Sequence, residues 1–185
     1  MPILGALTGF LLLFGTATAT QPVIKPVASV RPHYTVTLTA YNAVPDQTRD
    51  HPLVTASGAY SNPEVIAARS QDLGAKLPFG TIIELDGSNI TSNDTCGYNI
   101  VAPHIGYRVI EDTMNVRYTN RIDVLLDTKT NYVSSGGRVV NAAVVLGLCK
   151  GVTIRVVGHV NFNQIPKTQA ELAAIVEKSS GLALK

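Results

Sequence analysis

The chain has 185 residues, of which 45% are hydrophobic and 15% are charged, so it is long enough and apolar enough to bury a core. These values exclude a disordered chain, and a net charge of +2 without a run of Lys or Arg argues against a nucleic-acid-binding protein. The two cysteines form no CxxC pair and no His lies at ligand spacing from them, so we expect no metal site and no cofactor.

The N-terminal segment, residues 1–19, has the pattern of a secretory signal peptide. An apolar run from Ile3 to Phe14 precedes Ala17-Thr18-Ala19, which fits the A-x-A cleavage pattern. The alternative is an uncleaved N-terminal anchor, which would be the chain's one attachment to a membrane. Residues 20–33 contain three prolines and are predicted to form an extended linker.

The middle of the chain is predicted to fold as a barrel over residues 34–160. Short runs rich in Val, Ile and Thr, separated by Gly, Asn, Asp and Pro, are typical of strands. The six expected strands cover residues 34–41, 65–68, 79–85, 107–112, 121–126 and 152–158. Residues 139–148 fit a strand or a helix, and Asn141-Ala142-Ala143 with Gly147 favours a short helix. Six short strands predict a small closed barrel, because closure removes exposed sheet edges.

The C-terminal tail, residues 161–185, is predicted to carry an amphipathic helix. Thr168-x-x-Glu171 is a capping box in front of Leu172, Ile175 and Val176. This helix would either lie on the barrel or be loosely tethered to it.

Cys96 and Cys149 allow two interpretations. In an exported protein they are expected to form a disulfide, whereas in a reducing compartment they would be two unrelated thiols.

The stretch from Glu111 to Asp127 holds the candidate chemistry. Asp112 ends one apolar strand and Asp123 lies at the start of the next, so rigid backbone would present both carboxyls. The competing interpretation is that both residues form turns, since Asp is common where a strand ends.

Several short motifs occur in a characteristic order. They are Thr55-Ala56-Ser57-Gly58, Val65-Ile66-Ala67-Ala68, Leu77-Pro78-Phe79-Gly80-Thr81, Tyr107 to Thr113, and Arg121-Ile122-Asp123-Val124. In this order they resemble the 3D domain family, named for three aspartates, which includes the C-terminal part of membrane-bound lytic transglycosylase A and muralytic resuscitation or sporulation enzymes. The resemblance covers residues 34–158. It implies a six-stranded double-psi β-barrel. With the two helices predicted from the residue pattern, the expected fold is mainly β, with a short helix before the last strand and a C-terminal helix.

The resemblance also implies residue roles. Asp123 matches the catalytic acid/base and Asp112 matches the second aspartate, which supports or polarises it. The third aspartate of the family usually follows the Ile-Ala strand, where this chain has Ala68-Arg69-Ser70, so it is either absent or displaced to Asp72. The family's Asp-Thr-Gly-Gly becomes Asp112-Thr113-Met114-Asn115 here.

Four further residues are candidates for substrate binding. Thr55 and Ser57 are expected either to donate hydrogen bonds to sugar groups or to bond their own turn. Tyr41 would stack on a sugar face or pack its ring in the core. Arg121 lies on the same strand face as Asp123 and is expected to point at the substrate or at another acid.

Together these features predict a secreted, periplasmic or wall-associated monomer that acts on peptidoglycan glycan strands. The resemblance implies a lytic transglycosylase that cleaves the β-1,4 bond between N-acetylmuramic acid and N-acetylglucosamine and leaves a 1,6-anhydromuramoyl end. The alternative is a non-catalytic, expansin-like module that binds or loosens cell-wall polysaccharide, because a fold does not fix a function.

Overall fold

The computed structural model describes residues 31–48, 51–91 and 95–182. The predicted signal peptide at 1–19 and most of the predicted linker at 20–33 lie outside this part. None of the helices in the described part is long and apolar enough to cross a membrane.

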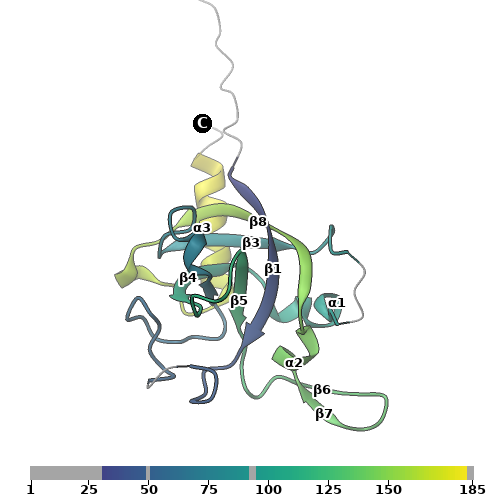
Figure 1. Cartoon of the computed structure of the whole chain (residues 1–185). Coiled ribbons are helices and arrows are strands. Elements are labelled where there is room, and N and C mark those ends of the chain that lie inside the picture. The colour runs from purple at the N-terminus through teal and green to yellow at the C-terminus, as the bar shows by residue number, and fades with distance from the viewer. Residues whose placement is uncertain (1–30, 49–50, 92–94, 183–185) are drawn as a thin grey trace, which may run out of the picture.

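Six strands close into a barrel, in the order β1-β5-β2-β4-β3-β8, which confirms the closed six-stranded barrel predicted from the sequence (Figure 1). Their bounds are β1 His33–Tyr41, β2 Ile66–Arg69, β3 Thr81–Asp86, β4 Arg108–Thr113, β5 Arg121–Leu125 and β8 Cys149–His159. The barrel is mixed: β1 pairs with β5 and β2 with β4 in parallel, and the other neighbours are antiparallel.

Alternate residues of the strands enter two apolar clusters, as the two-residue period of a strand requires. Leu38, Ala67 and Ile122 belong to the larger cluster, to which all six barrel strands contribute. Ala68, the residue after Ala67, and Leu125, three residues after Ile122, belong to the second cluster. This cluster also receives side chains of the C-terminal helix. This alternation sets which face each polar side chain of the site can reach.

Residues 139–148, which the sequence allowed to be a strand or a helix, contain one of each. A strand, β7 Val139–Asn141, pairs with β6 Asn131–Val133 in a separate two-stranded sheet, and a short helix, α2 Ala142–Leu146, follows at once. The Asn141 side chain accepts a hydrogen bond from the Ala143 amide, which caps the start of α2. The helix before the last strand is therefore confirmed, and the hairpin is an addition to the prediction.

The long connection between β3 and β4 is not a plain loop. It holds α1 Tyr98–Val101 and a one-turn helix, η2 Ala102–His104. Cys96, just before α1, forms a disulfide with Cys149 at the start of β8. The bridge therefore fastens this connection to the barrel.

The C-terminal helix, α3 Gln169–Leu182, is confirmed and lies on the barrel (Figure 1). Leu172 and Val176 pack into the second cluster, and the Thr168 hydroxyl accepts a hydrogen bond from the Glu171 amide as a cap. Two further one-turn helices are η1 Gln71–Leu73 and η3 Phe162–Gln164.

Candidate functional site

The two aspartates lie on the two strands that flank β2. Ala68 of β2 is in register with Asp112 of β4 on one side and with Asp123 of β5 on the other. Ile122 and Val124 enter the larger cluster, so Asp123 between them points to the opposite face. The small Ala68 side chain thus separates two carboxyl-bearing residues on neighbouring strands.

Of the aspartates near this site, Asp123 has the most strongly shifted pKa. Thr39 of β1, its partner in the parallel β1–β5 ladder, donates a hydrogen bond of 2.8 Å to its Oδ1. Burial raises the pKa of Asp123 from 3.8 to about 6, the charge of Asp112 adds to the rise, and the Thr39 hydroxyl and Arg121 oppose it. The side chain is nevertheless only half-buried, so a ligand can reach it.

Asp112 is held by three hydrogen bonds. Its Oδ1 accepts from the amides of Ala56 at 2.9 Å and Thr113 at 2.8 Å, and its Oδ2 accepts from the Tyr41 hydroxyl at 2.9 Å. Such bonds suit an ionised carboxylate and fix its orientation. The ring of Tyr41 is buried, and burial together with the charge of Asp112 holds the pKa of Tyr41 well above its usual value. Tyr41 therefore contacts Asp112 and does not offer an exposed face for stacking.

Thr55 and Ser57 support this arrangement from a turn. Thr55 is buried, its hydroxyl lies 3.0 Å from that of Ser57, and it accepts a hydrogen bond from the Ala59 amide. The Ser57 amide donates to the Glu111 carbonyl at 3.1 Å. Thr55 thus bonds its own turn, and that turn carries the Ala56 amide that binds Asp112.

Asp72 does not join the aspartate pair. It is exposed, and its carboxylate accepts the Asn120 amide at 3.0 and 3.2 Å. Hydrogen bonding from the Ser70 hydroxyl is the main cause that lowers the pKa of Asp72. The neighbouring Arg121 amide donates to the Ser70 hydroxyl at 3.0 Å. Ser70 and Asp72 therefore hold the start of β5, the strand that carries Asp123.

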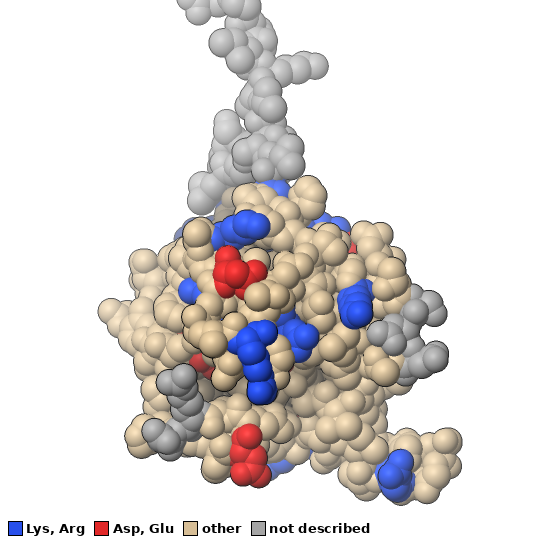
Figure 2. Space-filling view, in the orientation of Figure 1, with Lys and Arg blue, Asp and Glu red and all other residues tan. Residues whose placement is uncertain are grey.

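Arg121 stacks on an aromatic ring. Its guanidinium carbon lies 4.6 Å from the centre of the Tyr118 ring, and that of Arg117 lies 4.8 Å from the same centre. Arg117 also donates to the Tyr118 hydroxyl at 2.9 Å. The Arg121 Nε is buried and has no hydrogen-bond partner among the described residues. Figure 2 shows basic side chains gathered near the centre of the face that carries β1 and β5 in Figure 1.

Glu111 is a buried acid that sequence reasoning did not single out. Neither carboxyl oxygen has a hydrogen-bond partner in the described part of the chain. Burial raises the pKa of Glu111. The nearby Ser57 hydroxyl, Gly80 amide and His159 oppose this rise, although none of them forms a hydrogen bond with the carboxyl group. Thr39 was also missed, although it shares a strand face with Tyr41, two residues on, and this spacing could have indicated it.

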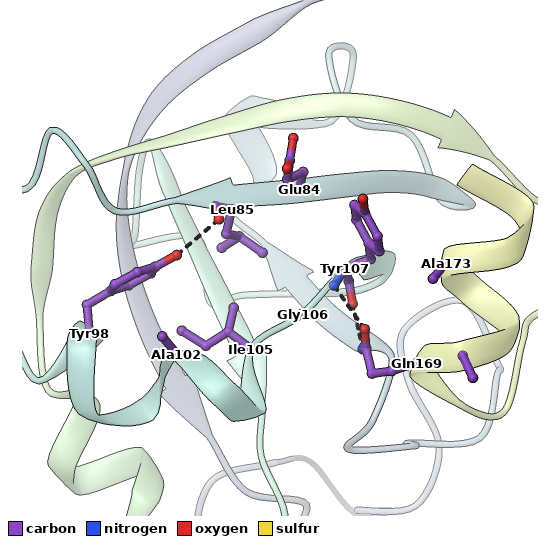
Figure 3. A pocket seen from close by; sticks show the side chains of 10 residues that line it. Glu84, Leu85, Tyr98, Ala102, Ile105, Gly106, Tyr107, Gln169 and Ala173 are labelled. Carbon is purple, nitrogen blue, oxygen red and sulfur yellow. Dashed lines mark hydrogen bonds between the residues drawn. The ribbon is translucent and has the colours of Figure 1, made fainter. Parts of the chain in front are cut away.

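Two pockets lie away from the aspartates. A pocket of about 540 Å³ opens between β3, the segment that precedes β4, and α3, where Gln169 bonds the backbone of Tyr107 (Figure 3). A second pocket of about 290 Å³ borders Asp127. Neither includes Asp112 or Asp123. In the described part of the chain no three His, Cys, Asp or Glu side chains are grouped so as to hold a metal ion.

Among known proteins, neither a family model nor a curated protein matches this chain. The geometry by itself defines a half-buried carboxyl with raised pKa beside a second carboxylate whose orientation is fixed. Such a pair can carry general acid/base chemistry.

Proposed function

We propose that this chain is an exported peptidoglycan lytic transglycosylase that cleaves the β-1,4 bond between N-acetylmuramic acid and N-acetylglucosamine. Asp123 is the catalytic acid/base in this proposal, and Asp112 is the carboxylate beside it. The observation that carries it is the raised pKa of Asp123, about 6, on a half-buried side chain next to a hydrogen-bonded second carboxylate. The Cys96–Cys149 disulfide supports export, since such bonds persist in oxidising compartments.

The chemistry requires one group to give a proton and later to take one. Protonated Asp123 delivers its proton to the glycosidic oxygen as the bond to the muramic C1 breaks, which releases the N-acetylglucosamine hydroxyl. The resulting carboxylate takes the proton of the muramic C6 hydroxyl, whose oxygen bonds to C1 and closes the 1,6-anhydro ring. The proton on Asp123 is thereby restored, and no water is consumed.

Asp112 has a different task. Three donors fix its carboxylate, so it can stabilise the positive charge that develops at C1 in an oxocarbenium-like transition state. Its charge also adds to the effect of burial, which is the main cause that raises the pKa of Asp123.

Digestion of purified sacculi by the chain tests the proposal, with mass spectrometry of the released fragments. We expect 1,6-anhydromuramoyl ends from the parent chain and from Asp127→Asn, whose exposed carboxylate caps a turn, and none from Asp123→Asn. Reducing ends in place of anhydro ends would indicate hydrolysis by the two carboxyls. A folded parent chain that releases no product would overturn the proposal.

A second candidate function is a non-catalytic module that binds cell-wall polysaccharide. It is favoured by the position of the two pockets described above, neither of which is lined by Asp112 or Asp123. Under this alternative, sacculi would pull down the parent chain and Asp123→Asn equally, and neither would release fragments.

A further inference from the structure

We propose that Arg117 and Arg121, on either side of Tyr118 in sequence and both stacked on its ring, form a binding subsite for a carboxylate carried by the glycan next to Asp123. This inference rests on the proposed function, and it adds the group of the substrate that is recognised. We call these three residues the Arg-Tyr-Arg platform.

Within the described structure the two cations of the platform form no ion pair, although the charge of Arg121 acts on Asp123. The ion pairs of the described residues are those of Arg155 with Glu84 and Asp86. In the described structure the side chains of Arg117 and Arg121 both contact Tyr118. The Nε of Arg121 is buried without a partner in the described structure, whereas its two terminal nitrogens are not among the buried unpartnered atoms and are the donors that a ligand could reach.

The platform is held in place before any ligand binds. Asn115 accepts the Arg117 amide through its side chain and the Tyr118 amide through its carbonyl. At the other end of the loop, Asn120 adopts a left-handed conformation, with φ of 48°, and is fixed by Asp72 and by the Thr35 carbonyl. A ligand would therefore bind without first ordering this loop, which preserves binding free energy.

The position of the platform relative to Asp123 indicates which ligand it would bind. Arg121 and Asp123 are two residues apart on one strand face, which separates their backbones by roughly 7 Å. A group bound by Arg121 would then sit on the sugar whose bond is broken or on its neighbour. Guanidinium groups bind carboxylates through paired N–H donors. The muramic lactyl group carries a free carboxylate where its peptide stem has been removed, and an attached stem carries carboxylates of its own.

Sedimentation of the chain with sacculi measures the subsite separately from catalysis. The assay uses the Asp123→Asn background, so that no sacculus is degraded, and compares intact sacculi with sacculi whose carboxyl groups have been amidated. Arg117→Gln and Arg121→Gln are the test variants. Arg138→Gln removes an equal charge from the β6–β7 turn, which projects away from the barrel, and serves as the matched control (Figure 1).

We expect either test substitution to weaken binding to intact sacculi roughly tenfold, the effect of one lost charge-assisted hydrogen bond. Amidation should weaken the unsubstituted background similarly and should abolish the difference between it and the test variants. Arg121→Lys, which keeps the charge without the paired donors, should recover part of the affinity. Arg117 is exposed, so its substitution tests the subsite even if Arg121→Gln fails to fold.

Two results would overturn the inference: equal binding of amidated and intact sacculi, or test variants that bind as Arg138→Gln does. The proposed cleavage is judged independently. If the parent chain releases anhydro products while the Arg variants bind normally, the subsite is wrong and the activity stands. Carboxylate-dependent binding without any released product would support the subsite and contradict the activity.

Discussion

Substituting Asp123 by Asn should abolish glycan cleavage and, above about pH 6, should stabilise the fold. Both effects have one structural cause. The side chain lies among Thr39, Arg121 and Asp112 in surroundings that penalise its ionised form, with burial as the largest contribution. Asn has nearly the same shape and can still accept the Thr39 hydroxyl, so the change removes the ionisation with little change in packing.

The magnitude follows from linkage. The pKa of Asp123 rises from 3.8 to about 6 in the folded chain, which corresponds to about 3 kcal/mol at full effect. Because the folded pKa is the higher one, the native state binds more protons between these two values, and stability falls as the pH rises through that window. Asn carries no such penalty. Since Asp123 is half-buried and partly screened, we expect a gain of about 1–3 kcal/mol near pH 8 and little difference near pH 3.

Urea unfolding at several pH values measures this difference, and Asp127→Asn is the control because its carboxylate is exposed. The same pKa predicts that the acid step of the parent chain slows as the pH rises above about 6. A stability difference that does not change between about pH 3 and about pH 8 would refute the raised pKa. An Asp123→Asn chain that still released anhydro ends would refute the acid/base role even if the stability effect were found.

Three further predictions concern the support of the site. Reducing the Cys96–Cys149 disulfide, which closes a loop with a sequence separation of 53, should lower the free energy of unfolding by about 4 kcal/mol in urea titrations, and an unchanged midpoint would contradict this. Glu111→Gln should stabilise the chain increasingly as the pH rises, because burial raises the folded pKa of Glu111 and the ionised form has no hydrogen-bond partner among the described residues; equal stability of both chains at alkaline pH would show that Glu111 ionises without cost. Asp72→Ala should speed hydrogen exchange of the Asn120 amide and reduce cleavage without abolishing it, and unchanged exchange would mean that Asp72 does not hold the start of β5.

The sequence predicted the barrel well because its strands repeat a two-residue pattern. In β1 and β5 apolar residues such as Leu38 and Ile122 alternate with polar ones, and the structure buries the apolar set. The hairpin of β6 and β7 has no such signal. Its strands are three residues long and largely exposed, so neither a pattern nor a long apolar run marks them.

The sequence named Asp112, Asp123 and several candidate residues around them, while the contacts between these residues came only from the structure. The order of motifs pointed to Asp112 and Asp123, and the strand register then placed them on either side of Ala68 of β2. The hydrogen bonds of Thr39 and Tyr41 join residues that are 84 and 71 positions apart in the chain. Pairings at such separations depend on the closed barrel, and no local pattern contains them.

The segment around the end of β2 places no third aspartate beside the pair. At Ala68 a methyl group leaves room for carboxyl side chains on both neighbouring strands, and an acid there would place another like charge beside Asp123. Ser70 and Asp72 instead bind the backbone amides of Arg121 and Asn120. The segment thus positions the start of β5, which carries Arg121 and Asp123, and the end of the loop that carries Arg117 and Tyr118.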